Sequence, residues 1–209
     1  MISHYVRSKK MGLFGNCWDA LKWGFSTNFS HIGRWLLLTI LSIIPIICWF
    51  AEGALLKILK GEEPDIAPAG KSFVTGFFLF LIALIYVIVP CLIMMIPVIG
   101  WIIGIILTIL VCLIMIPAEI NFARSGKFSK AFAFGEIFGM ISKLGWGKYI
   151  LAIIVMIIFA ILVSIVLSII YFILGLIPVV GIILAIIIGI LAFIPLLCWE
   201  FKYWNDVFA

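Results

Sequence analysis

Two glutamates, Glu119 and Glu200, are the residues of this 209-residue chain best placed to carry chemistry. Each ends a long run without Asp, Glu, Lys or Arg, so its carboxylate is expected near the hydrocarbon of a membrane, where ionisation is costly. Asn121 and Arg124 follow Glu119 closely enough to pair with it. Such carboxylates could bind a cation or a proton. Alternatively, they mark where helices leave the membrane.

Sequence motifs of the common enzyme classes do not occur in the chain. It has no H-E-x-x-H, no Gly-rich phosphate loop, no G-x-S-x-G and no pair of carboxylates inside an apolar run. Both histidines lie outside the long apolar runs, and the five cysteines form no C-x-x-C. We therefore expect no enzyme, no metal site and no cofactor.

The composition places the chain in a membrane. Hydrophobic residues make up 67% and charged residues 11%, whereas soluble domains hold about 45–50% and about 25%. The net charge of +5 comes from basic residues that flank apolar runs. This pattern indicates contact with anionic lipid headgroups and argues against nucleic acid as a partner.

Two charge-free runs, residues 72–118 and 149–199, organise the fold. A span needs about 20 apolar residues, so each run can hold two spans joined by a turn. Pro97 with Gly100, and Pro178 with Gly181, supply P-x-x-G turns. The sequence therefore predicts an all-α integral membrane protein with two transmembrane hairpins. The four full spans are expected at residues 73–95, 101–117, 149–176 and 182–199.

The two hairpins are related by a shift of 81 residues. This shift superimposes the Pro and Gly of the two turns and also places Glu119 on Glu200. Internal repeats of this kind are common in transporters. If the repeat holds in the fold, the two glutamates could share one ion site around a pseudo-two-fold axis.

The first apolar run, residues 35–51, is too short for two spans and carries Pro45 near its middle. It could be one short span or a re-entrant pair of half-helices. The re-entrant arrangement places all 14 Lys and Arg residues on one side of the membrane. By the positive-inside rule we expect a multi-pass protein of the cell membrane with both termini and the charged connectors in the cytoplasm.

Two amphipathic segments, residues 12–30 and 127–143, are predicted to be helices lying in the headgroup plane. Each combines bulky apolar residues with basic ones. Lys22, Lys127, Lys130 and Lys143 are the expected headgroup contacts. The alternative is that these helices pack on other protein segments.

Residues 52–65, EGALLKILKGEEPD, and the following F-x-x-G-F at residues 73–77 resemble a family connector. The family is an uncharacterised prokaryotic one, archaeal by this resemblance, in which a lead-in helix precedes a span, a P-x-x-G turn and a second span. Ala54 stands where that family usually has Tyr. The pattern is also distantly similar to the membrane domain of glycerophosphodiester phosphodiesterases. The resemblance covers residues 12–205 and implies an architecture without an assigned function.

From these observations we expect a single membrane domain over residues 1–209. It divides along the chain into residues 12–56 (interfacial helix and short or re-entrant segment), 57–124 (connector and first hairpin) and 125–209 (interfacial helix and second hairpin). We expect a non-enzymatic protein that acts through lipid contact and through association with a second copy or another membrane protein. The alternatives are a small transporter or channel that uses Glu119 and Glu200, and, less favoured, a lipid-modifying enzyme.

Overall fold

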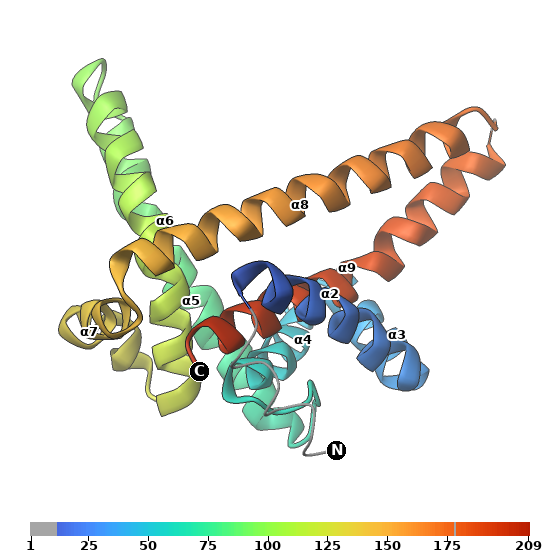
Figure 1. Ribbon diagram of the computed structural model, residues 1–209, viewed down its shortest axis with the longest axis horizontal. Helices are drawn as coiled ribbons and strands as arrows, with labels where there is room; N and C mark the ends of the chain where they lie inside the picture. Colours follow the sequence, from blue (N-terminus) through green and yellow to red (C-terminus); the bar gives the residue numbers. More distant parts are fainter. Residues whose placement is uncertain (1–11, 178) are drawn as a thin grey trace. The chain divides into compact units, whose positions relative to one another are not determined.

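The structure is a computed structural model that describes residues 12–177 and 179–209. These residues form helices joined by turns and short connectors (Figure 1), which confirms the predicted all-α class. In chain order the elements are α2 (Leu13–Ser30), α3 (Ile32–Ile43), α4 (Cys48–Leu55), η2 (Leu56–Lys60), α5 (Ala69–Met94), α6 (Ile99–Ser125), η3 (Phe128–Phe132), α7 (Phe134–Leu144), α8 (Trp146–Gly175) and α9 (Val180–Val207).

The chain divides into two compact units. The central unit is Ile44–Leu144 and holds α4, η2, α5, α6, η3 and α7. The terminal unit joins Met1–Ile43 to Gly145–Ala209 and, in its described part, holds α2, α3, α8 and α9. The segments predicted from the sequence follow the chain, whereas each unit combines one hairpin with helices from outside the predicted segment of that hairpin. Whether the two units together form the single membrane domain expected from the sequence stays a prediction.

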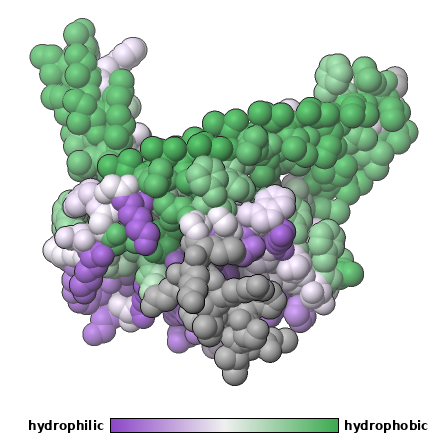
Figure 2. Space-filling model, in the orientation of Figure 1, coloured by the Kyte–Doolittle hydropathy of each residue, from purple (hydrophilic) through white to green (hydrophobic). Residues whose placement is uncertain are grey.

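Four of the described helices, α5, α6, α8 and α9, are long and apolar enough to cross a membrane. They contain 26 to 30 residues, which at about 1.5 Å per residue is roughly 39–45 Å, more than the ~30 Å hydrocarbon core. In their most apolar windows only 11–22% of the residues are buried inside the protein. Figure 2 shows both hairpins covered by hydrophobic residues. The four predicted spans are confirmed, and the chain is a multi-pass membrane protein.

The turns of the two hairpins have the same backbone geometry. Val98 has φ 64° and ψ −69°, and Val179 has φ 63° and ψ −62°. The amide of Ile99 donates a hydrogen bond to the carbonyl of Pro97 over 2.8 Å, which closes a strained γ-turn on Val98. Because Val98 and Val179 are separated by 81 residues, the shift found in the sequence holds for the geometry of the turns.

Each hairpin turn is closed by a glycine that contacts the preceding helix. A methyl group placed at Gly100 would lie 2.1 Å from the carbonyl oxygen of Ile93, and one at Gly181 would lie 1.7 Å from that of Leu174. Ile93 and Leu174 are again 81 residues apart. Only a residue without a side chain permits this approach, which explains the P-x-x-G pattern.

The first apolar run is two short helices and not one continuous span. α3 has 12 residues and α4 has eight. Between them Ile46, which follows Pro45, has φ 71°, the same positive-φ step that occurs at Val98 and Val179. At about 1.5 Å per residue neither helix reaches across ~30 Å of hydrocarbon.

The first amphipathic segment forms the predicted helix, α2, but one of its faces packs on protein. Its buried residues are small or polar: Cys17, Ala20, Gly24, Thr27 and Asn28. They lie against α9, where a methyl group at Gly24 would come within 2.6 Å of the carbonyl oxygen of Pro195. The opposite face exposes large side chains, among them Phe14, Trp18 and Phe29.

The second amphipathic segment is not the single helix that the sequence predicted over residues 127–143. It divides into η3 and α7, with Ala133 at the break between them. Side chains of distant helices hold the carbonyls of η3: the Tyr86 hydroxyl donates to Ala131 over 2.7 Å, and the Asn121 amide donates to Lys130 over 2.9 Å. These donors lie on α5 and α6, outside the segment itself, so the local periodicity does not reveal the break.

Close backbone contacts join α4 to α5 in the central unit. A methyl group at Gly53 would lie 1.8 Å from the carbonyl oxygen of Ser72, and one at Gly76 would lie 1.9 Å from that of Trp49. The indole of Trp49 then packs among the aromatic rings of α5. In the terminal unit, the hydroxyl of the fully buried Tyr203 on α9 donates to the carbonyl of Ala152 on α8 over 2.8 Å.

Candidate functional site

Asn121 on α6 is the centre of a polar cluster in the central unit. Its side-chain amide donates one hydrogen bond to the carbonyl of Lys130, over 2.9 Å, and one to the carboxylate of Glu136, over 3.1 Å. The Lys130 ammonium forms an ion pair with the same carboxylate. We call Asn121, Lys130 and Glu136 the Asn121 cluster. It ties α6 to both η3 and the first turn of α7.

The Asn121 cluster lowers the pKa of Glu136. The hydrogen bond from Lys130 is the largest cause and the bond from Asn121 the next, and both stabilise the carboxylate form. Glu136 also lies in the first turn of α7, where the helix dipole favours a negative charge. The arrangement therefore favours an ionised Glu136 carboxylate that is bound by Lys130 and Asn121.

Arg124, one turn further along α6, contacts the other connector of the central unit. Its Nε donates to the carbonyl of Leu59 in η2 over 3.3 Å. Two of the four residues predicted for an ion site, Asn121 and Arg124, thus use donors to position connectors. From the sequence both residues are predicted to pair with Glu119. The partners found in the structure are Lys130 and Glu136 for Asn121 and Leu59 for Arg124.

Glu119 and Glu200 belong to different units. Glu119 is partly buried on α6 of the central unit, and Glu200 is exposed on α9 of the terminal unit. Within the described residues, no three His, Cys, Asp or Glu side chains are grouped as metal ligands. A shared ion site of Glu119 and Glu200 stays a prediction.

The four lysines expected at lipid headgroups have different surroundings. Lys22 is exposed on α2, with its ammonium 5.1 Å from the ring centre of Trp18. Lys127 and Lys143 are exposed in the central unit, whereas the Lys130 ammonium is paired with Glu136. Lys22, Lys127 and Lys143 thus present charges to the surroundings, and Lys130 has a partner inside the protein.

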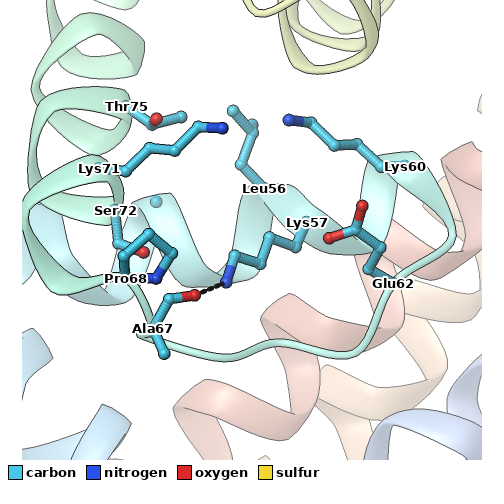
Figure 3. Close-up of a pocket in the computed structure, with 10 residues that line it drawn as sticks. Leu56, Lys57, Lys60, Glu62, Ala67, Pro68, Lys71, Ser72 and Thr75 are labelled. Carbon is cyan, nitrogen blue, oxygen red and sulfur yellow. Dashed lines mark hydrogen bonds between the residues drawn. The ribbon is translucent and has the colours of Figure 1, made fainter.

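A second polar site, which the sequence did not single out, is a cavity of about 230 Å³ between η2 and the start of α5. Figure 3 shows its basic residues Lys57, Lys60 and Lys71, with Glu62 at one side. We call this cavity the lysine pocket. Its full lining is Gly53, Leu56, Lys57, Lys60, Glu62, Ala67, Pro68, Lys71, Ser72 and Thr75.

The three lysines of the pocket are engaged differently. The Lys57 ammonium donates to the carbonyl of Ala67 over 2.5 Å. The ammonium groups of Lys60 and Lys71 point toward one another from opposite sides, with the side chain of Leu56 between them in the view of Figure 3. All residues of the central unit are described, and among them no side chain or carbonyl forms an ion pair or hydrogen bond with the ammonium group of Lys60 or Lys71. The backbone amide of Lys71 donates to the carbonyl of Pro68 over 3.1 Å. The pocket therefore offers two ammonium groups that are not engaged by a described residue, with Glu62 as the one acidic residue of the lining.

The sequence does contain a signal for the lysine pocket. Lys57 and Lys60 are three residues apart in a helical segment, so they lie near one another on its surface, and Lys71 is the last charge before the first charge-free run. The charge pattern along the chain indicates membrane orientation, but it does not show that the three lysines line one cavity. The fold of the 61–68 connector, which returns the chain to η2, brings them together.

The sequence comparisons give a family without a known activity. Residues 37–172 match the family described as "Protein of unknown function (DUF4013)". No curated protein and no solved structure matches the chain. An archaeal source and a likeness to glycerophosphodiester phosphodiesterases find no support in these comparisons. Because the match covers more than half of the sequence and includes the first hairpin with its connectors, the chain belongs to the DUF4013 family.

Proposed function

We propose that this protein is a non-enzymatic integral membrane protein that acts through lipid contact and through association with partner proteins, either a second copy or another membrane protein. The observation that carries the proposal is the outward-facing apolar surface of the hairpins. In α8 the buried residues are Tyr149, Ala152 and Val155, and none of residues 156–175 is buried. This surface requires lipid or protein around it.

The face of α2 that does not pack on α9 supports the lipid part of the proposal. Phe14, Trp18 and Phe29 each expose half or more of their surface, and Lys22 adds a cation beside Trp18. Aromatic rings next to basic side chains are typical of helices at the headgroup level. An anionic lipid surface satisfies both kinds of group.

The distribution of charge supports an orientation. If α3 and α4 form a re-entrant segment, all 14 Lys and Arg residues lie on one side, and the uncharged turns at Val98 and Val179 lie on the other. The positive-inside rule then puts the connectors and both termini in the cytoplasm. The short lengths of α3 and α4 favour this arrangement over a full span.

The transporter alternative receives less support from the geometry. Asn121 and Arg124 use donors to hold connectors, so part of the predicted ion site has a structural use. The Ser164 hydroxyl in α8 is likewise used within its own helix, since it donates to the carbonyl of Ala160 over 2.7 Å. These contacts favour a packing role for the polar residues.

Photo-crosslinking from α8 in native membranes tests the proposal. A photoreactive residue at Ile157, Ile161 or Val166, all more than half exposed and spread around the helix, should give lipid adducts on one part of the helix surface and a discrete protein adduct on another. The same residue at the buried Ala152 is the control and should crosslink within the chain. Lipid adducts alone at every exposed position would contradict partner association, and extraction by alkaline carbonate would contradict membrane integration.

A further inference from the structure

We propose that the lysine pocket binds a phosphate group, and that its position favours the phosphate of an anionic lipid headgroup as the source. The inference deepens the lipid-contact function proposed above and rests on it. It assigns a ligand class and a defined site where the proposed function names only a surface.

The charge of the pocket is suited to an anion. Lys57, Lys60 and Lys71 line it against a single carboxylate, that of Glu62. Lys60 and Lys71 direct their ammonium groups toward one another although like charges repel (Figure 3). An anion between them would convert this repulsion into two charge-assisted hydrogen bonds.

The start of α5 adds a second source of positive potential. This 26-residue helix begins after Pro68, which provides no side-chain cap, and its first turn has no acidic residue. The positive end of the helix dipole is therefore not neutralised locally, and such ends bind phosphate. Pro68, Lys71 and Ser72 from this first turn all line the pocket.

The size of the pocket limits the ligand. A cavity of about 230 Å³ is smaller than the ~300–1,000 Å³ of pockets that enclose a whole drug-sized molecule. It can admit a phosphate with a small attached group, while acyl chains must stay outside. Lysine, a point charge on a flexible stem, accepts a tetrahedral phosphate without requiring the planar geometry that arginine prefers.

The position of the pocket along α5 favours a lipid as the source of the phosphate. Lys71 is followed by the charge-free run of residues 72–118, so the pocket opens where α5 enters the hydrocarbon. Lipid phosphates lie at this depth, and basic pockets beside membrane helices bind lipid headgroups elsewhere. A soluble phosphate would have to compete with them.

Ligand titration of the full-length protein in a neutral detergent tests the proposal, with bound ligand counted by native mass spectrometry. The probes are a short-chain phosphatidic acid, phosphatidylcholine of the same chain length, and inorganic phosphate. We expect one phosphatidic acid to bind with saturation. Lys60→Gln with Lys71→Gln should raise its Kd at least tenfold.

Three matched variants separate a built site from general attraction between charges. Lys148→Gln, in the first turn of α8 and outside the expected headgroup contacts, removes an exposed charge away from the pocket and should change the Kd less than threefold. Lys60→Arg with Lys71→Arg keeps the charge and should retain binding. Glu62→Gln removes the opposing carboxylate and should lower the Kd. Circular dichroism and melting of each variant without ligand show that the fold is intact.

The outcomes decide both the proposal and its source. Saturable binding of phosphatidic acid but not of inorganic phosphate, lost in the pocket variant, supports the lipid source. Equal binding of inorganic phosphate with the same dependence on Lys60 and Lys71 supports the pocket and overturns the lipid source. Equal effects of the pocket and control variants would overturn the pocket. The proposed function is tested separately, because carbonate extraction and lipid crosslinking from α8 do not depend on Lys60 or Lys71.

Discussion

The indole Nε1 of Trp35 on α3 donates a hydrogen bond to the backbone carbonyl of Leu191 on α9 over 3.1 Å. Leu191 precedes Pro195 by four residues within α9. Proline has no N–H, so the helix itself cannot satisfy the carbonyl four residues before it. Trp35 replaces the missing donor and attaches α3 to α9.

This relationship predicts a coupling between Trp35 and Pro195. Trp35→Phe removes the donor and should lower the free energy of unfolding by about 1 kcal/mol. In a Pro195→Ala background the alanine N–H can reach Leu191, so the same substitution should cost much less. A double-mutant cycle from thermal unfolding in detergent measures the coupling. Equal costs in both backgrounds would show that Trp35 acts only through packing.

The close contact between α4 and α5 predicts that two glycines cannot be replaced. Gly53→Ala or Gly76→Ala places a methyl group within 2 Å of a backbone carbonyl oxygen and should destabilise the protein by about 1–3 kcal/mol. Gly70→Ala, in the first turn of α5, is the control because nothing lies within 4 Å of its added methyl group. Melting temperatures of the three variants provide the test. Equal melting of Gly53→Ala and Gly70→Ala would contradict the packing.

The geometry of the hairpin turns predicts that valine lowers the stability of the protein at positions 98 and 179 relative to glycine. Val98 and Val179 are branched residues at positive φ, a conformation in which a non-glycine residue stores about 1–3 kcal/mol. They expose 77% and 68% of their surface, so little packing is lost on substitution. Val98→Gly and Val179→Gly should each raise the melting temperature, whereas Val87→Gly inside α5 should lower it. A fall with all three would contradict the turn geometry.

The Asn121 cluster predicts a pH-dependent contribution to stability. The pKa of Glu136 is lowered in the folded protein, so its contribution is complete above the unfolded value of about 4.3. It is lost as the pH falls through the folded pKa. The wild type should therefore exceed Glu136→Gln in stability at neutral pH, and the difference should vanish in acid. Unfolding curves from pH 7 to pH 3 measure it, with Asp19→Asn, at an exposed carboxylate on α2, as the comparison for a general loss of negative charge.

The proposed orientation predicts labelling from one side only. In a background without the native cysteines, Ser129→Cys in η3 should react with an impermeant maleimide only after the cells are opened. Met95→Cys, in the turn before α6 and 78% exposed, should react on intact cells. Labelling of Ser129→Cys from outside would contradict the re-entrant arrangement of α3 and α4.

Native Cys17 is predicted to stay unlabelled in the folded protein. Its side chain is buried in α2, and this burial, as the largest cause, raises the pKa of its thiol to about 11. The thiolate is the reactive form, so alkylation at pH 7 should require unfolding. Mass spectrometry before and after denaturation measures it, and reaction at the rate of a free thiol would contradict the packing of α2 on α9.

The sequence by itself determined the spans and the turns between them. Whether a segment crosses a membrane depends on its own length and apolarity, and residues 72–118 and 149–199 carry that information locally. The Pro and Gly of each turn act within a few residues, so the 81-residue relation was visible before the backbone of Val98 and Val179 was known. The helix at residues 12–30 likewise followed from local periodicity.

Only the tertiary structure decided which segments pack together and where the polar groups converge. The approach of Gly24 to Pro195 and of Gly53 to Ser72 involves backbone carbonyls, which every residue has and no sequence pattern distinguishes. The break in residues 127–143 depends on donors from Tyr86 and Asn121 on other helices. The lysine pocket exists because the connector places Lys71 opposite Lys60. Contacts between residues distant along the chain depend on the shape of the whole unit, whereas insertion into a membrane is a property of each segment.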